Sequence, residues 1–189
     1  KDGWITTLNL QNNNLQGTLP AELAFLTVLE QLDLSQNALT GSLPTEMGLL
    51  VTLKTINLSQ NLLSGPLPTQ LSNISTLQEL NVSHNDLTGT IPHAIDAWTN
   101  LQVLAASNNS LQGTLPSTLE ELTALQILDL GDNFLTGSIP HTMVFLNSLT
   151  TLWLHQNQLN SSLPIDFGRL SNLEHLSLQE NSISGVIPS

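Results

Sequence analysis

The sequence predicts a solenoid of eight similar coils, each built from a short β-strand, a turn and a short helical return. The first observation is a repeat of 24 residues without insertions, in which Asn37 and Pro44 recur at fixed positions. The second is a change of leucine spacing inside each repeat, from two residues, as on one side of a strand, to three, as on one face of a helical turn. A leucine-rich period of this length is typical of stacked repeats that share one core.

We expect one domain over residues 1–189, because stacked repeats form a continuous core rather than separate globular units. Its coils begin near residues 5, 29, 53, 77, 101, 125, 149 and 173. Trp4 precedes the first coil, where we expect it to cover the open apolar end. The last coil stops at Ser189, directly after its proline and before its helical return. We therefore expect the chain to be a fragment of a longer one, or to stack on another component.

Glycine and proline mark the turn of each coil. In the first coil, Pro20 follows the turn and suits the first turn of a short helix, where its missing N–H has no partner in any case. Gly17, three residues earlier, fits a tight bend that requires permissive backbone angles. Ser161 replaces this glycine in the seventh coil, which predicts a local change of turn geometry.

The charge balance excludes several classes of function. The chain contains 15 Asp and Glu against three Lys and Arg, a formal net charge of -12, which opposes binding to nucleic acid and to anionic membranes. No apolar run approaches the roughly 18 residues needed to span a bilayer, so we expect no direct membrane insertion by this segment. The chain has no cysteine and therefore no thiolate metal site or cysteine nucleophile. We expect no cofactor.

The repeat frame LxxLxLxxNxLxGxIPxxLxxLxx resembles the plant-type extracellular leucine-rich repeat of receptor ectodomains and polygalacturonase-inhibiting proteins. The segments DLSQNALTGSLP, NVSHNDLTGTIP and DLGDNFLTGSIP are close to that pattern, which covers residues 5–189. The resemblance implies a right-handed superhelix with a parallel β-sheet on its concave face, and a short second strand and 3-10 or helical returns on its convex side. It also implies a secreted or lumenal location and a role in recognition. The paired-cysteine caps common in secreted plant members are missing.

The recurring asparagines predict a structural ladder inside the solenoid. Their amides are suited to bond with backbone groups of neighbouring coils and so to satisfy the polar groups of the turns. We favour this role over ligand binding. The ladder residues are Asn13, Asn37, Asn61, Asn85, Asn109, Asn133, Asn157 and Asn181.

Threonine and serine flank the glycines, and this arrangement has two interpretations. A regular hydroxyl ladder on one outer side is how an ice-binding surface would look. The alternative, which we favour, is a consensus at a short second strand. Pro66, Asn160 and Val186 interrupt the ladder and support that preference.

The outward strand positions alone are free to carry specificity, because the leucines between them form the core. Strands about 4.8 Å apart over eight coils make a face roughly 38 Å long, enough for a protein or an extended chain. From the fifth coil onward this face gains aromatic, aliphatic and charged residues, the composition of an interface hot spot centred on Trp153. The candidate partner-binding residues are Val103, Ile127, Asp129, Asp132, Phe134, Trp153, His155 and His175. For Phe134 an alternative is packing on its own turn.

An enzyme with its catalytic residues on this face is an alternative hypothesis. Asp132 and His155 occupy adjacent strands at nearly matching positions, and Ser177 lies one strand further on. An open sheet offers this set neither an oxyanion hole nor a pocket that excludes water. His155 and His175 are about 13 Å apart by strand spacing, too far for a shared metal. We therefore predict no catalytic residue and no metal site.

Five sequons for N-linked glycosylation are present, a number close to that expected by chance in this composition. Their asparagines are Asn57, Asn73, Asn81, Asn108 and Asn160. Asn57 and Asn81 fall on outward strand positions. Glycans there would cover the early part of the concave face and leave the Trp153 region open.

These observations favour a non-catalytic module that binds a protein, peptide or glycan ligand through its concave face, as in an extracellular receptor or inhibitor. The alternative is a structural subunit that docks into a larger assembly through its open ends or its flank. Ice binding by the hydroxyl ladder is a minor third hypothesis.

Overall fold

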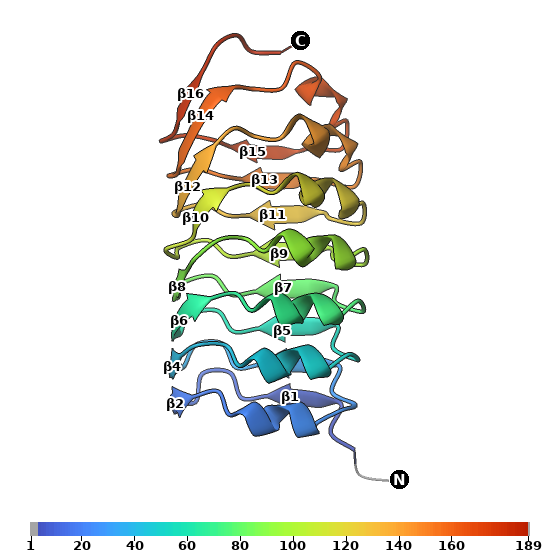
Figure 1. Cartoon of the computed structure of the whole chain (residues 1–189), viewed down its shortest axis with the longest axis vertical. Helices are drawn as coiled ribbons and strands as arrows, with labels where there is room; N and C mark the ends of the chain where they lie inside the picture. Colours follow the sequence, from blue (N-terminus) through green and yellow to red (C-terminus); the bar gives the residue numbers. More distant parts are fainter. Residues whose placement is uncertain (1–3, 189) are drawn as a thin grey trace.

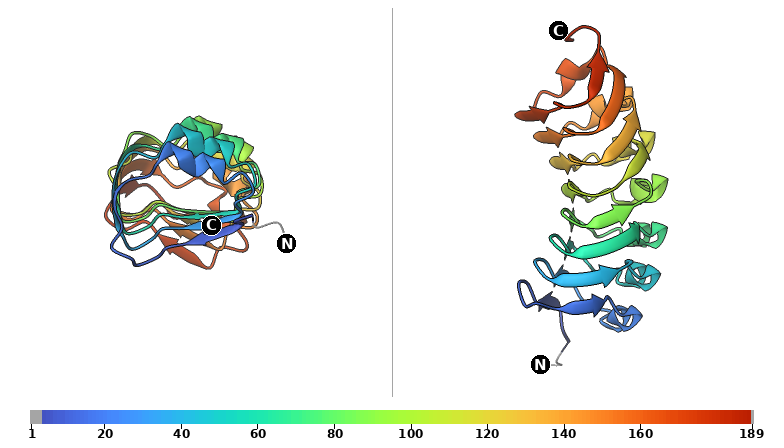
Figure 2. Two further views of the ribbon diagram at one scale, coloured as in Figure 1. Left: turned by 90° about the horizontal axis from the view of Figure 1, so that it is seen from below. Right: turned by 90° about the vertical axis from the view of Figure 1, so that its left-hand side faces the viewer.

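Each repeat forms one coil of an elongated stack in the computed structural model, which describes residues 4–188 (Figure 1). A coil runs from a first strand through a turn into a second strand, and then through a 3-10 helix to the next first strand. Seen along the stack, the first strands, the second strands and the helices occupy three different sides (Figure 2). The predicted solenoid of strands and short helical returns is confirmed.

The first strands form one parallel eight-stranded sheet in the order in which they occur in the chain. Each residue pairs with the residue one repeat later, as Thr7 pairs with Gln31 and Gln31 with Thr55. Side chains at one strand position therefore line up across the whole sheet. The strands are β1 (Thr7–Asn9), β3 (Gln31–Asp33), β5 (Thr55–Asn57), β7 (Glu79–Asn81), β9 (Val103–Ala105), β11 (Ile127–Asp129), β13 (Thr151–Trp153) and β15 (His175–Ser177).

The second strands form two four-stranded parallel sheets along the flank of the stack. One consists of β2 (Gln16–Thr18), β4 (Ala38–Gly41), β6 (Leu62–Pro66) and β8 (Asp86–Thr88). The other consists of β10 (Gln112–Thr114), β12 (Phe134–Gly137), β14 (Gln158–Ser162) and β16 (Ser182–Ser184).

The helical returns are short 3-10 helices, and each of the first six begins directly after a proline. Pro20 has extended backbone angles and precedes the helix, so its predicted place inside the first turn is wrong by one residue. Its carbonyl accepts the first helical hydrogen bond, from the N–H of Leu23 at 3.1 Å. The helices are η1 (Ala21–Phe25), η2 (Thr45–Leu49), η3 (Thr69–Asn73), η4 (His93–Ala97), η5 (Ser117–Glu121), η6 (His141–Phe145) and η7 (Phe167–Arg169). None within residues 4–188 has the length and apolar character to cross a membrane.

At Gly41, two features of the turn require a glycine. Gly41 has a φ of 76°, in the left-handed region, and a Cβ added to it would lie 2.8 Å from the γ-methyl of Thr18 in the preceding coil. Ser161 keeps the same conformation, with a φ of 78°, so the predicted change of turn geometry is wrong. The preceding coil offers Ser138 at the position of Thr18, and a serine has no γ-methyl to meet the extra Cβ.

Leucine and isoleucine side chains stack into one continuous core that follows the axis of the solenoid. Leu32, Ile56 and Leu80 on successive first strands are all fully buried. Trp98 follows η4 directly, at the position that Ile74 holds after η3 and Leu122 holds after η5, and Trp98 is only 2% exposed. Its Nε1–H donates to the carbonyl of Leu71 at 2.9 Å, which satisfies the polar atom that comes with the larger side chain.

The repeated asparagines join adjacent coils. Asn85 is 9% exposed, and its Oδ1 accepts from the N–H of Leu63 in the preceding coil at 2.9 Å. Its Nδ2 donates to the carbonyl of Leu58 in that coil and of Val82 in its own coil, both at 3.0 Å. The same contacts recur through Asn61, Asn109, Asn133 and Asn157.

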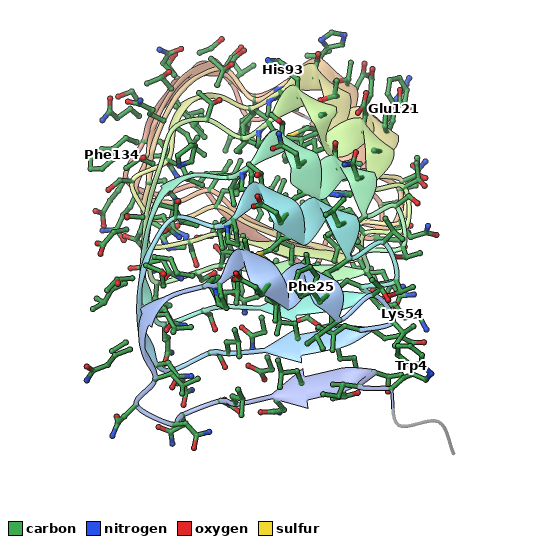
Figure 3. The ribbon with its side chains drawn as sticks, turned by 60° about the horizontal axis from the view of Figure 1, so that its bottom comes forward. Trp4, Phe25, Lys54, His93, Glu121 and Phe134 are labelled. Carbon is green, nitrogen blue, oxygen red and sulfur yellow. The ribbon has the colours of Figure 1, made fainter. Side chains whose placement is uncertain are left out.

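Trp4 does not pack over the first coil. Trp4 is 69% exposed and lies beside the beginning of β1, at the edge of the first coil (Figure 3). Apolar side chains including Leu8, Leu15 and Leu23 line a hollow of about 250 Å³ in the first two coils, and Trp4 does not line it. The expectation that Trp4 covers this end is therefore wrong.

Asn85→Ala is expected to lower the free energy of unfolding by about 1 to 3 kcal/mol, because it leaves buried backbone groups without hydrogen-bond partners. Chemical denaturation measures the loss. Asn13→Ala is the control, since Asn13 is exposed and its amide N–H donates only within its own coil. Equal stability of Asn85→Ala and the parent would contradict the ladder role.

Ser161→Gly is expected to raise the free energy of unfolding by about 0.5 to 1 kcal/mol. Relief of the left-handed conformation gains about 1 to 2 kcal/mol, and the greater freedom of unfolded glycine offsets roughly 0.5 to 1 kcal/mol of it. Gly137→Ser is the matched control and should destabilise, because its Cβ would lie 2.9 Å from the γ-methyl of Thr114. Thermal melts that rank the two variants in the opposite order would refute this account.

Candidate functional site

The register of the large sheet sorts its outward side chains into columns, each holding one strand position from all eight coils. The first column reads Thr7, Gln31, Thr55, Glu79, Val103, Ile127, Thr151 and His175. The second column reads Asn9, Asp33, Asn57, Asn81, Ala105, Asp129, Trp153 and Ser177. Both are polar in the early coils, and both change character at the fifth coil.

The second column has a structural task in the early coils. The side-chain oxygen of Asp33 accepts the N–H of Ser35, two residues further along, at 3.0 Å. The equivalent contact recurs at Asn9, Asn57, Asn81 and Asp129. Ala105 and Trp153 have no side-chain oxygen to make it, so the regular pattern is lost on both sides of Asp129.

Trp153 lies at the end of β13, and its side chain remains 39% exposed. Its partners in register are Asp129 on β11 and Ser177 on β15. Adjacent strands are about 4.8 Å apart, so the side chains of Trp153 and Asp129 leave the sheet side by side. The small side chain of Ala105 flanks this carboxylate on its other side.

Asp129 is held in place by two hydrogen bonds. Its Oδ2 accepts from the Oγ–H of Ser107 on the preceding coil at 2.7 Å, and its Oδ1 accepts from the N–H of Gly131 at 3.2 Å. Neither partner carries a charge. Of the three ion pairs found within residues 4–188, none includes Asp129.

His155 and Asp132 form the second charged feature of this region. The His155 Nε2 lies 3.3 Å from the Asp132 Oδ2, and both side chains are about a quarter exposed, at 22% and 28%. The imidazole lies over Gly131, where a Cβ would come within 2.7 Å of its Nδ1. Other coils carry serine at the position of Gly131, as at Ser107. The absence of a side chain at Gly131 is what makes room for the imidazole.

We define the Trp153 patch by the residues that the large sheet and its adjoining turns bring together. They are Val103, Ile127, Asp129, Asp132, Trp153 and His155. His175 is exposed in the first column on the last strand.

Phe134 lies apart from the Trp153 patch. It begins β12, which belongs to a flank sheet, and its side chain is 52% exposed there (Figure 3). The chain turns between β11 and β12, which carries Phe134 off the face that holds Trp153.

The residues considered for catalysis do not converge. Ser177 pairs in register with Trp153, and its Oγ–H donates to Gln179 Oε1 at 2.7 Å. The hydroxyl is thus directed along its own strand, while His155 bonds to Asp132. A Ser–His–Asp relay needs the serine hydroxyl to bond to the histidine.

The cations of the described chain lie away from the Trp153 patch. Lys54 pairs with Glu30 at 2.7 Å, and Arg169 lies 3.5 Å from Asp166, in the last helical return. The acidic side chains of the patch therefore face solvent without a lysine or arginine from residues 4–188.

The sequence interpretation missed Ala105, Ser107 and Gly131. Ala105 and Gly131 leave space, and Ser107 holds the Asp129 carboxylate. A signal was present in the sequence, because Gly131 interrupts a position that is polar in the other coils, and Ala105 is the first residue without a polar side chain in the second column. Their role appears only when neighbouring coils are compared in register.

The sequon asparagines fall into two groups. Asn57 and Asn81 are half-buried in the second column, and the Asn57 Oδ1 accepts from the Oγ–H of Ser59 at 2.8 Å. Asn73, Asn108 and Asn160 are exposed. Glycosylation at any of them stays a prediction.

Family models described as leucine-rich repeat match most of the chain. One covers residues 99–159, and another covers residues 4–26, 28–50, 52–74, 76–98 and 172–189. A search of curated proteins found no significant match.

Solved structures of plant proteins are similar over nearly the whole chain. The plant peptide hormone receptor RGFR1 in complex with RGF2 is 38% identical with a TM-score of 0.96, over 97% of this chain and 29% of that one. The ectodomain of the Arabidopsis thaliana receptor kinase GASSHO1/SCHENGEN3, in complex with CASPARIAN STRIP INTEGRITY FACTOR 2, is 38% identical with a TM-score of 0.93, over 94% of this chain and 21% of that one. The chain thus spans less than a third of either receptor chain.

A plant ice-binding protein is also similar. It is 29% identical with a TM-score of 0.75, over 97% of this chain and 67% of that one.

Gly131→Ser is expected to lower the free energy of unfolding by about 1 kcal/mol or more, because the new side chain displaces the His155 imidazole and breaks its contact with Asp132. In a His155→Ser background the same change should cost little, since serines occupy this position in four consecutive coils. A double-mutant cycle from chemical denaturation gives the coupling, which we expect to exceed 0.5 kcal/mol. Additive effects would show that the two residues are independent.

Proposed function

Because the chain belongs to the leucine-rich-repeat family, in its plant-type extracellular class, we propose that it is a non-catalytic module that recognises a peptide or protein ligand through its large sheet. The observation that carries the proposal is the Trp153 patch, an exposed indole among aliphatic and charged side chains on an otherwise small and polar face. We further propose that the module acts as one domain, outside the cell or in a lumen.

The similar structures support a ligand of this class. RGFR1 and GASSHO1/SCHENGEN3 are described in complexes with RGF2 and CASPARIAN STRIP INTEGRITY FACTOR 2, and the former is described as a peptide hormone receptor. The large sheet suits an extended ligand, because its columns offer the same geometry over eight strands. A ligand that runs along a column meets side chains from successive coils.

Trp153 is suited to be the main anchor of such a ligand. Its backbone is fixed between two neighbouring strands, so binding costs little conformational entropy. Its exposed part gains about 25 cal/mol for every Å² of apolar surface that a ligand covers. Tryptophans in this setting are among the residues whose truncation most often costs 2 kcal/mol or more in binding.

Catalysis is not part of the proposal. The Ser177 hydroxyl is bonded to Gln179, and the Trp153 patch lies on an open sheet. Such a face gives a ligand area to contact but no enclosed site that excludes water from a reacting group.

Docking through the end of the stack is a second candidate, favoured by the apolar hollow that Leu8, Leu15 and Leu23 help to line. A partner on that surface would lose affinity when Leu15 is replaced by a charged residue and would be unaffected by changes at Trp153.

We do not propose ice binding, although one similar structure is a plant ice-binding protein. The γ-methyls of Thr18, Thr90 and Thr114 pack over the glycines of the following coil, which explains these threonines by coil packing. Pro66 and Val186 also occupy this flank and interrupt its hydroxyl pattern.

Selection of phage-displayed random linear peptides on the immobilised protein tests the proposal. Trp153→Ala should weaken the selected peptides by about tenfold or more, which corresponds to roughly 1.4 kcal/mol or more. Phe25→Ala is the matched control, because Phe25 is an 80% exposed aromatic residue on helix η1, on another side of the stack. Isothermal titration calorimetry with synthetic copies of the selected peptides measures their affinity for the parent and for both variants. Peptides that bind Trp153→Ala as tightly as the parent would contradict recognition through this patch.

A further inference from the structure

We infer that the Trp153 patch recognises a cationic side chain, arginine above all, in an extended peptide. This inference rests on the function proposed above and adds the chemical class of the ligand. It follows from three observations: an indole face beside a carboxylate, a second carboxylate on the adjoining turn, and the absence of a lysine or arginine that would neutralise them within residues 4–188.

The first step is the placement of Trp153 next to Asp129. The two residues pair in register on adjacent strands, so their side chains are direct neighbours on the same face of the sheet. A guanidinium that lies on the indole face gains a cation–π interaction, and at its edge it meets the carboxylate. Arginine suits this better than lysine, because its planar group stacks and donates several hydrogen bonds at once.

The second step is the state of the Asp129 carboxylate. Its bonds to the Ser107 hydroxyl and the Gly131 N–H fix its orientation and leave its negative charge without a cation among the described residues. Carboxylate oxygens have about four lone-pair sites, so two hydrogen bonds leave acceptor capacity for a ligand. The carboxylate is therefore oriented in advance for a donor that approaches from the solvent side.

The third step is the surrounding charge. Asp132 lies on the turn that follows β11, and its only ion-pair partner within residues 4–188 is His155, at 3.3 Å. Lys54 is engaged by Glu30, and Arg169 lies beside Asp166. The whole chain has a formal net charge of -12, which favours the approach of cationic ligands and disfavours acidic ones.

The half-buried side chains of Val103 and Ile127 in the neighbouring column add a requirement on the peptide. They form an apolar strip beside Asp129 and Trp153. A residue next to the arginine in an extended peptide would meet this strip. The patch therefore fits an arginine adjacent to an apolar residue, within a peptide of low negative charge.

The test uses the random-peptide selection and a matched pair of charge variants of the full chain. Asp129→Asn removes the carboxylate charge at the patch, and Asp33→Asn removes the same charge at the same column position in the second coil. Asparagine occupies this position at Asn9, Asn57 and Asn81, so neither change conflicts with the fold. Both variants have the same net charge, which separates a local contact from general attraction.

Peptides that depend on Trp153 are expected to be enriched in arginine relative to the unselected library. Asp129→Asn should lower the affinity for these peptides about fivefold or more, while Asp33→Asn should change that affinity less than about twofold. Replacing the peptide arginine by glutamine should weaken binding to the parent and have little further effect on Asp129→Asn. These couplings would support a direct contact.

Two outcomes overturn the inference, and they are distinguishable from failure of the proposed function. If the Trp153-dependent peptides lack arginine and lysine, or if Asp129→Asn and Asp33→Asn weaken them equally, the patch is a recognition site without a specific cation contact. If no selected peptide depends on Trp153, the proposed function and this inference fail together.

Discussion

The hydrogen bonds of the repeated asparagine amides are the interaction on which the rest of the structure depends. Each buried amide serves backbone groups of its own coil and of the one before it, as Asn85 does for Val82 and Leu58. The turns bring these groups into the interior, where unpaired polar atoms are costly. With the amides in place, the coils stack in a fixed register, the leucines form one core and the outward side chains form straight columns.

That regularity confines specificity to the positions where coils differ. In the early coils, the second column is occupied by Asp and Asn whose side chains accept a hydrogen bond from the backbone two residues further on. These side chains therefore stabilise their own coil. Ala105 and Trp153 give up this local bond. The face around Asp129 thereby gains both space and an aromatic surface.

Substitutions in the later coils compensate one another across strands. His155 fits because Gly131 has no side chain beneath it, and the Asp129 carboxylate is held by Ser107 from the preceding coil. Such pairs keep the column geometry intact while the chemistry changes. A solenoid can vary its binding face in this way without disturbing its core, because each coil contacts mainly its nearest neighbours.

The sequence by itself determined the solenoid, its strand and helix order and the residues of its core. Each coil repeats the same local pattern, so a position that is ambiguous in one coil can be assigned from the equivalent positions in the other coils. It also indicated Trp153 as an exposed aromatic residue on the sheet. Only the tertiary structure decided which side chains meet, since contacts between coils join residues 22 to 27 positions apart. The tertiary structure places Phe134 on the flank, keeps Trp4 out of the lining of the first hollow, and gives Ser161 the left-handed backbone conformation of a glycine. It also places Asp129 between Ser107 and Trp153, an arrangement that follows from strand register and from no local feature of the sequence.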